Sequence, residues 1–431
     1  MRESSGFGLR LVLAGSLAGA LMLSFSSPVV AQSYDQQNLV SDLPGLAPTM
    51  DPNLVNPWGI VFPPNGPFWI ADNNAGASTL YDGNGHPFPP TSPLVVMIPP
   101  PKGGSGSGTP TGIVFNGTPD FVISKGSASG PALFIFATED GTITGWNFSV
   151  DLTHAILSVD NSGLGGADGS ALGAVYKGLA IGNNGSGNFI YASNFRDGVV
   201  EMYDAKFTFV TSFTDPQIVP DASNPGFAPF GIRNINNQLF VTFAMQNADR
   251  HDDVKGPGNG FVDVFDLNGN FIERFASGGR LNSPWGLALA PDHFGKFSDD
   301  LLVGNFGDGR INAFKKEDVK NDEEDNDKED GEDNGLEGHS FHGQLKDSHG
   351  QPITIDGLWG LTFGNGNVAG ATNVLFFTAG IVDESHGLFG RIIAREKENN
   401  DAEDNDREAK KDQGNDNEKD HGDDHGNKSE D

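Results

Sequence analysis

The sequence predicts an all-β protein, specifically a six-bladed β-propeller with four-stranded blades whose ring is closed by an N-terminal strand. Three observations lead to this fold class. The 431 residues include 59 glycines and 26 prolines, so turn formers separate many short apolar stretches. A glycine-centred apolar phrase recurs six times, and each copy is followed by further short strands in the same order. Such a pattern is typical of β-proteins built from repeated units.

The recurring phrase marks the first strand of each unit. Its six copies read NPWGIVF, TPTGIVF, VYKGLAI, FAPFGIR, SPWGLAL and GLWGLTF, centred on Gly59, Gly112, Gly178, Gly231, Gly286 and Gly360. The glycines are 53, 66, 53, 55 and 74 residues apart, and the last interval contains a 21-residue acidic segment whose removal leaves 53. A near-constant period of this length indicates a repeat architecture.

Further strands follow each phrase. The second strands are predicted at 67–73, 132–138, 188–194, 238–244, 300–306 and 374–380, and third strands follow each of them. Fourth strands are predicted in five units, at 94–99, 155–160, 207–213, 271–276 and 340–347. Four short strands joined by Asp-Gly and Asn-Gly turns are typical of one propeller blade.

The sixth unit has no fourth strand of its own, because the chain becomes highly charged after residue 395. The segment QNLVSDL at 37–43 supplies the missing strand, so the propeller is predicted to span 36–395. Closing the ring in this way leaves no long exposed sheet edge.

The glycine of each phrase is expected where inner strands crowd around the central channel, since glycine allows two backbones to approach closely. The residues that precede these glycines are Trp58, Thr111, Lys177, Phe230, Trp285 and Trp359. The large rings either pack between blades or form a partly exposed aromatic mouth that stacks on a ligand.

The first 31 residues are predicted to be a signal peptide. Arg2 and Arg10 precede an uncharged run at 11–25, and Val29 and Ala31 supply the small residues expected before a cleavage site. The run is shorter than the roughly 20 residues that span a bilayer, so no stable membrane anchor is expected. The mature protein is therefore predicted to be secreted or periplasmic.

Charge and cysteine content exclude some functions. The chain has no cysteine, which removes thiolate catalysis and Cys-ligated zinc. The net charge is −31, of which segment 317–337 carries −10 and segment 396–431 carries −9, leaving −12 elsewhere. Both segments are predicted to be disordered, the first as an insert in blade five and the second as a tail. So acidic a chain is not expected to bind nucleic acid.

Candidate site residues lie where second strands end. Asn73, Asn194 and Asn305 are expected at one level in alternate blades, where amide oxygens could join carboxylates in binding a hard cation such as calcium. The alternative is that they only hold strand-end turns. No catalytic residue is assigned, because the common catalytic motifs are missing.

Two loops on the same face carry further candidates for ligand binding. The loop at 246–260 contains Asp252 and Asp253, and the loop at 382–387 contains Glu384 and His386. Carboxylates beside histidine can bind a metal ion or act as acid and base, although exposed loops are also polar for solvation alone.

A family resemblance supports the fold. The run SPWGLALAPDHFGKFSDDLLVGNFGDGRINAF, with NLVSDLPG and NPWGI near the start, resembles an uncharacterised family of exported bacterial proteins related to NHL repeats. The likeness covers about 36–394 apart from the acidic insert. Some members end in a Pro-Glu-Pro sorting tail, whereas this chain ends in charged residues only. The resemblance implies a propeller and no established activity.

Two function classes follow. The preferred hypothesis is an exported binding or scaffold protein, monomeric, that uses its channel-mouth face to bind a small molecule or protein. The alternative is a metal-dependent hydrolase, by analogy with six-bladed lactonases.

The charged tail generates a first prediction. Deleting residues 396–431 should leave the Tm almost unchanged, because a segment this polar buries little apolar surface. Calorimetry of the full and shortened chains tests this, and a drop of more than a few degrees would show that the tail is folded against the ring.

Overall fold

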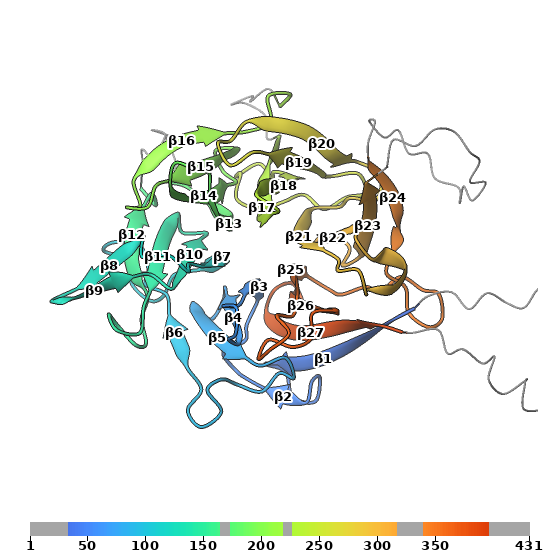
Figure 1. Cartoon of the computed structure of the whole chain (residues 1–431), viewed down its shortest axis with the longest axis horizontal. Coiled ribbons are helices and arrows are strands. Elements are labelled where there is room, and N and C mark those ends of the chain that lie inside the picture. Colours follow the sequence, from blue (N-terminus) through green and yellow to red (C-terminus); the bar gives the residue numbers. More distant parts are fainter. Residues whose placement is uncertain (1–32, 164–172, 219–225, 317–338, 396–431) are drawn as a thin grey trace, which may run out of the picture. The chain divides into compact units, whose positions relative to one another are not determined.

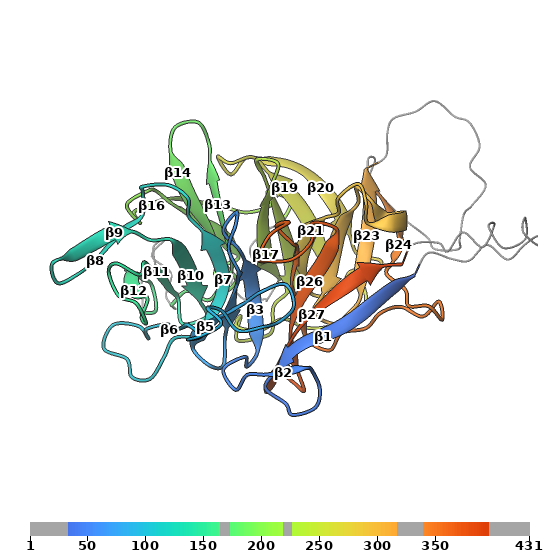
Figure 2. The same ribbon diagram turned by 60° about the horizontal axis from the view of Figure 1, so that its bottom comes forward.

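The computed structural model describes residues 33–163, 173–218, 226–316 and 339–395, which form six sheets around a central axis (Figures 1 and 2). The protein is thus an all-β, six-bladed propeller with four-stranded blades, as the sequence predicted. The predicted leader at 1–31, the insert at 317–337 and the tail at 396–431 lie outside the described residues. Within the described part of the chain, no helix has the length and apolar character to cross a membrane.

The six glycine phrases form the innermost strands, which surround the axis in Figure 1. They are β3 (Pro57–Val61), β7 (Pro110–Phe115), β13 (Tyr176–Asn183), β17 (Phe227–Ile235), β21 (Pro284–Leu289) and β25 (Leu358–Phe363). The second strands are β4 (Phe68–Asp72), β10 (Phe134–Thr138), β14 (Asn188–Asn194), β18 (Gln238–Met245), β22 (Leu301–Asn305) and β26 (Val374–Ile381).

Third and fourth strands complete the blades. The third strands are β5 (Ala77–Tyr81), β11 (Thr142–Trp146), β15 (Val199–Tyr203), β19 (Phe261–Phe265), β23 (Ile311–Lys316) and β27 (His386–Ala394). Five blades end in their own outer strand: β6 (Val95–Met97), β12 (Ile156–Asp160), β16 (Phe209–Phe213), β20 (Phe271–Ser277) and β24 (His339–Gln344). Neighbouring strands within each blade are antiparallel, so the chain runs back and forth from the axis outward.

The ring is closed by the N-terminal segment, as predicted. Strand β1 (Tyr34–Ser41) pairs antiparallel with β27, from Tyr34 opposite Ala394 to Ser41 opposite Leu388. The short β2 (Thr49–Met50) adds to β1 in parallel and gives this sheet a fifth strand. Two ends of the chain therefore share one blade.

One element was not predicted. Strands β8 (Val122–Lys125) and β9 (Ala128–Pro131) follow β7 in the chain and form a separate hairpin that projects outward from the outer side of the blade, next to β12 (Figures 1 and 2). It falls within the 66-residue interval between Gly112 and Gly178. Its sequence, VISKGSASGP, is polar and lacks the apolar alternation that identified the other strands.

A three-residue 3-10 helix, η1 (Gly295–Phe297), precedes β22.

The inner glycines have the predicted role of allowing close approach. A Cβ atom built on Gly286 would lie 2.4 Å from the carbonyl oxygen of Trp359 in the next blade, and one on Gly360 would lie 2.7 Å from that of Trp58. The other four inner glycines meet the backbone of the following inner strand at 2.2–2.9 Å. Each contact joins adjacent blades, so six glycines set the spacing of the whole ring.

The hydrophobic core lies between the blades. In one such layer, Trp69 and Leu80 of the first blade pack against Phe134 and Trp146 of the second, and the Trp69 and Phe134 rings stack with centroids 3.9 Å apart. Buried aromatic pairs of this kind contribute stability beyond the apolar area they bury. The flat faces of adjacent sheets are thereby joined into one ring.

Replacing an inner glycine should weaken this ring. We expect Gly286→Ala to lower the free energy of unfolding by about 1–3 kcal/mol or more, because the added methyl group overlaps backbone atoms that cannot rotate away. Denaturant titration measures the change. The control is Gly187→Ala, whose added Cβ would lie 3.7 Å from the nearest atom, in the ring of Phe189. Equal stability of both variants would contradict the role assigned to Gly286.

Candidate functional site

Aromatic side chains close the channel at the level of the inner glycines. Trp58 and Trp359 stack with ring centroids 3.5 Å apart, and Phe306 stacks on the other face of this pair at 3.9 Å from Trp359. Phe230 and Phe195 complete the cluster, and all five side chains are buried. The rings therefore form an aromatic plug across the axis, defined by Trp58, Phe195, Phe230, Phe306 and Trp359.

The plug decides between the two interpretations of the aromatic residues. Trp58, Phe230 and Trp359 have almost no exposed surface, so they pack against one another rather than presenting a face to a ligand. Trp285 is the one half-buried member of the pre-glycine set, and its indole Nε1 donates to the carbonyl oxygen of Lys177 at 2.9 Å.

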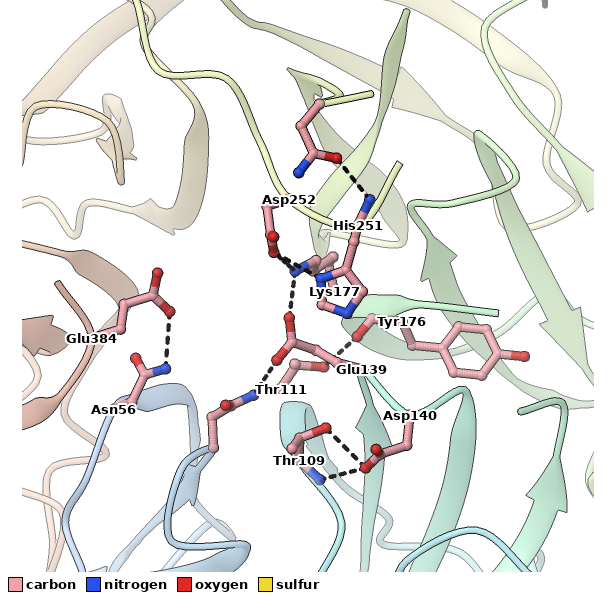
Figure 3. Close-up of polar contacts among 12 residues, drawn as sticks. Asn56, Thr109, Thr111, Glu139, Asp140, Tyr176, Lys177, His251, Asp252 and Glu384 are labelled. Carbon is pink, nitrogen blue, oxygen red and sulfur yellow. Dashed lines mark hydrogen bonds and ion pairs between the residues drawn. The ribbon is translucent and has the colours of Figure 1, made fainter. Parts of the chain in front are cut away.

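Lys177 holds the centre of the channel mouth above this plug (Figure 3). Its side chain is only 2% exposed, and Nζ donates a short hydrogen bond to Oε1 of Glu139 and lies 3.3 Å from Oδ1 of Asp252. The ammonium also lies 5.2 Å from the centre of the Trp58 ring, within range of a cation–π interaction. A charged residue at a position that is otherwise aromatic or threonine thus brings a cation to the axis.

The carboxylates around Lys177 come from loops that follow the second strands. Glu139 directly follows β10, and its Oε2 accepts a hydrogen bond from Nδ2 of Asn73 at 2.8 Å. Asp252 lies in the loop after β18, where its Oδ1 is 2.9 Å from Nδ1 of His251. Second strands all end on this face, so loops from different blades reach the same point.

Glu384 lies beside this group and is held from the first blade (Figure 3). Nδ2 of Asn56 donates to its Oε2 at 2.9 Å, while Oδ1 of Asn56 accepts from Nε1 of Trp359 at 3.1 Å. Nδ2 of Asn74 donates to the Glu384 carbonyl oxygen at 2.7 Å. The orientation of Glu384 is therefore coupled to the aromatic plug through one asparagine.

Burial and charge shift the acid–base properties of this group. Burial alone would lower the pKa of Lys177, but Glu139 and Asp252 raise it above its ordinary value. The hydrogen bond from His251, with the nearby Lys177 charge, lowers the pKa of Asp252 to about 2. Burial raises the pKa of Glu384, and the negative charge of Glu139 adds to this effect. Glu384 therefore gives up its proton less readily than an ordinary glutamate does.

The structure places the three predicted asparagines differently from one another. In the strand register, Asn194 pairs with Tyr176 and Asn305 with Pro284, while the equivalent partner of Pro57 is Asp72 rather than Asn73. Side chains alternate along a strand, so a shift of one residue changes the direction in which a side chain points.

Consequently, of the three asparagines only Asn73 contacts one of the charged residues around Lys177, namely Glu139. Nδ2 of Asn194 donates to Asp197 and Glu201 of its own blade, at 2.7 and 2.8 Å. Nδ2 of Asn305 donates to Asp308 at 3.0 Å and to the carbonyl oxygen of Arg280 at 2.8 Å. The contacts with Asp197 and Asp308 lie within strand-end turns, whereas those with Glu201 and Arg280 reach the next strand and an earlier loop.

The remaining predicted residues also separate. Asp253 is half-buried next to the exposed Asp252, and desolvation raises its pKa. His386 begins β27, where its Nδ1 lies 2.6 Å from Oδ2 of Asp42 in the N-terminal segment. His386 thus contributes to ring closure, whereas Asp252, Asp253 and Glu384 lie at the channel mouth.

Sequence reasoning missed Glu139, Lys177, Asn56 and Lys255 as site residues. The signal for Lys177 was present, because a lysine among inner-strand aromatics is unusual. Thr138 aligned with the three asparagines in the sequence, and Glu139 is the next residue. The sequence comparison of the second strands therefore ended one residue before Glu139. Lys255, whose Nζ lies 4.1 Å from the centre of the Phe306 ring, could not be placed without knowing how its loop folds.

One metal arrangement is geometrically open at the mouth. Glu139, His251 and Asp252 each offer a ligand atom, and these atoms lie within 4.8 Å of one another. Oxygen and imidazole ligands suit several divalent cations. Both carboxylates, however, already pair with the Lys177 ammonium, so a metal ion would have to displace that side chain from Glu139.

Fold and mouth together define a six-bladed propeller with a buried ammonium group and several carboxylates at one end of its channel. The chain is 31% identical over 358 residues to "Uncharacterized protein R648" of Acanthamoeba polyphaga mimivirus, a match covering 82% of this chain and 78% of the viral protein. "Uncharacterized protein L690" of the same virus is 31% identical over 359 residues, covering 82% and 84%. The chain belongs to the family of these mimivirus proteins.

Other comparisons add little. No protein-family model matches the chain. Among solved structures, virginiamycin B lyase from Staphylococcus aureus is similar over 84% of this chain and 99% of that one, at 12% identity and a TM-score of 0.40, which carries no argument about activity. The relatives in the sequence comparison are viral proteins, so the exported bacterial origin expected from the resemblance stays a prediction.

Replacing Lys177 by an uncharged residue should lower the free energy of unfolding. We expect Lys177→Met to cost about 3–5 kcal/mol at neutral pH, because it leaves the largely buried Glu139 without its cation. The deficit should narrow at acidic pH, where protonation of Glu139 removes the unpaired charge. In the wild type, the raised pKa of Lys177 means that its contribution is present at neutral pH and is lost only as the pH rises through that pKa.

Denaturant titration of both proteins at neutral and acidic pH measures this difference. The matched control is Lys125→Met, which removes a lysine that pairs with Asp151 at the surface, where Lys125 is 58% exposed. This control should change stability little. A Lys177→Met deficit that does not depend on pH would show that lost packing, not unpaired charge, is responsible.

Proposed function

We propose that the protein is an exported binding protein whose channel mouth binds a small cationic ligand. The observation that carries this proposal is the excess of carboxylates over ammonium groups at the mouth. Glu139, Asp252, Asp253 and Glu384 outnumber Lys177 and Lys255, so these six residues have a formal net charge of −2. An excess of negative charge attracts cations from solution.

Glu384 is the residue that gains most from a bound cation. Asn56 holds its carboxyl group in place, and Glu139 repels it. A cation bound between these two carboxylates would offset that repulsion and favour the ionised form of Glu384. An ammonium group of a small amine and a divalent metal ion share this chemistry, and both are candidate ligands.

A binding role is preferred to the metal-dependent hydrolase because of Lys177. In a hydrolytic site the metal ion needs its carboxylate ligands and an open position for water. Here the Lys177 ammonium already pairs with Glu139 and Asp252, which are two of the three possible ligands. The leader predicted at residues 1–31 supports export.

Isothermal titration with calcium, with 1,3-diaminopropane and with the neutral 1,3-propanediol tests the proposal. We expect saturable binding of at least one of the two cations and none of the diol. Glu384→Gln should weaken the binding by about tenfold, since it removes one charge-assisted contact. The control variant Asp292→Asn changes an acidic residue that is 74% exposed and should leave affinity unchanged.

The pH dependence gives an independent test. Because burial raises the pKa of Glu384, its carboxyl group takes up a proton at a higher pH than an ordinary glutamate does. Cation affinity should therefore decrease as the pH is lowered through that raised pKa, and Glu384→Gln should flatten the profile. Equal affinity for the diamine and the diol, or no binding of either cation, would refute the proposal.

A further inference from the structure

The second end of the channel contains a separate cavity. It has a volume of about 490 Å³, and the inner strands of all six blades line it from the glycine positions onward. Aliphatic side chains such as Ile60, Ile113 and Leu361 line it together with three asparagines, Asn234, Asn236 and Asn237, and volumes of this size are typical of small-molecule sites. The aromatic plug lies between this cavity and the mouth.

One cationic side chain lines this cavity. Arg233 of β17 reaches across two blades, and its Nη1 donates to the carbonyl oxygens of Leu287 at 3.1 Å and Leu361 at 2.5 Å. Its Nη2 donates to Oγ1 of Thr362 at 3.0 Å. These three contacts fix the guanidinium group in the channel through uncharged partners.

The guanidinium charge has no counter-charge of its own. In the described part of the chain, no carboxylate forms an ion pair with Arg233, although Arg274 and Arg395 pair with aspartates. Burial lowers the pKa of Arg233 to about 10, the direction expected for a cation removed from water without an anionic partner. Arg233 is half-buried, and a partly desolvated cation without an ionic partner would be stabilised by an anion in the cavity.

The remaining donors of Arg233 suit one class of anion. A guanidinium group has five N–H donors, and three are used by Leu287, Leu361 and Thr362. The Nε donor and one Nη2 donor have no acceptor among the described residues, and such a pair can bind a carboxylate through two parallel hydrogen bonds. A single cation beside the aliphatic side chains of the inner strands favours a ligand with one carboxylate and an apolar part.

We propose that this cavity binds a small organic monocarboxylate, with Arg233 holding the carboxylate and the aliphatic inner strands surrounding its apolar part. The site is at the opposite end of the channel from the mouth and does not depend on the cation site proposed there. Arg233 combines two functions, because the same guanidinium joins blades five and six through their carbonyl oxygens.

Isothermal titration of the full chain with benzoate, hexanoate, inorganic phosphate and the neutral benzyl alcohol tests the proposal. We expect saturable binding of benzoate or hexanoate, with benzyl alcohol and phosphate at least about tenfold weaker. Arg233→Gln should weaken carboxylate binding by more than about tenfold, whereas Arg233→Lys should retain part of it. Arg391→Gln, a change at an arginine of the ring-closing blade, is the control and should bind as the wild type does.

The outcomes separate a binding role from a structural one. Because Arg233→Gln also removes hydrogen bonds between blades, the Tm of this variant is measured first. If the variant does not fold, the proposal is tested by the binding of Arg233→Lys and by the comparison of benzoate with benzyl alcohol on the wild type. Glu384→Gln should leave benzoate binding unchanged, which locates the ligand away from the mouth. Absence of carboxylate binding, equal binding of benzyl alcohol, or a preference for phosphate would overturn the proposal.

Discussion

The close approach of six inner strands is the constraint on which the rest of the structure depends. At each inner glycine the backbone of the next blade lies where a Cβ atom would be, so the strands cannot move apart without losing their contact or together without overlap. This spacing fixes the width of the channel. A channel of that width is filled at one level by stacked rings of Trp58, Phe306 and Trp359 and stays open below them.

The plug divides the channel into two chambers of opposite charge. The mouth gathers carboxylates around Lys177, and the cavity beyond the plug contains Arg233 without an anionic partner among the described residues. The two cations differ in their surroundings. Lys177 is neutralised by residues of the chain itself, which makes it part of the framework, whereas Arg233 contacts only uncharged groups.

The fold was largely predictable from the sequence, and the site only in part, since Asn73, Asp252, Asp253 and Glu384 were candidates but Glu139 and Lys177 were not. The glycine phrases and their period identified the six inner strands, and the count of strands required QNLVSDL to close the ring. These features are local or periodic, so a single sequence displays them. The mouth is formed by residues that are distant in sequence, such as Glu139, Lys177 and Glu384, and only the three-dimensional arrangement of the blades brings them together. Asn73 was also placed one position out relative to Asn194 and Asn305, and a shift of one residue reverses a side chain's direction.

Ring closure also has a consequence for biosynthesis. Ser41 and Gly387 are hydrogen-bonded partners separated by 346 residues, and the pairing of β1 with β27 joins almost the first and last described residues. Contacts of such long sequence separation form late, because the whole intervening chain must be available. While the ribosome is still adding the last blade, β27 is not yet available to pair with β1 and the circle stays open. The native ring can therefore be completed only after β27 has been synthesised.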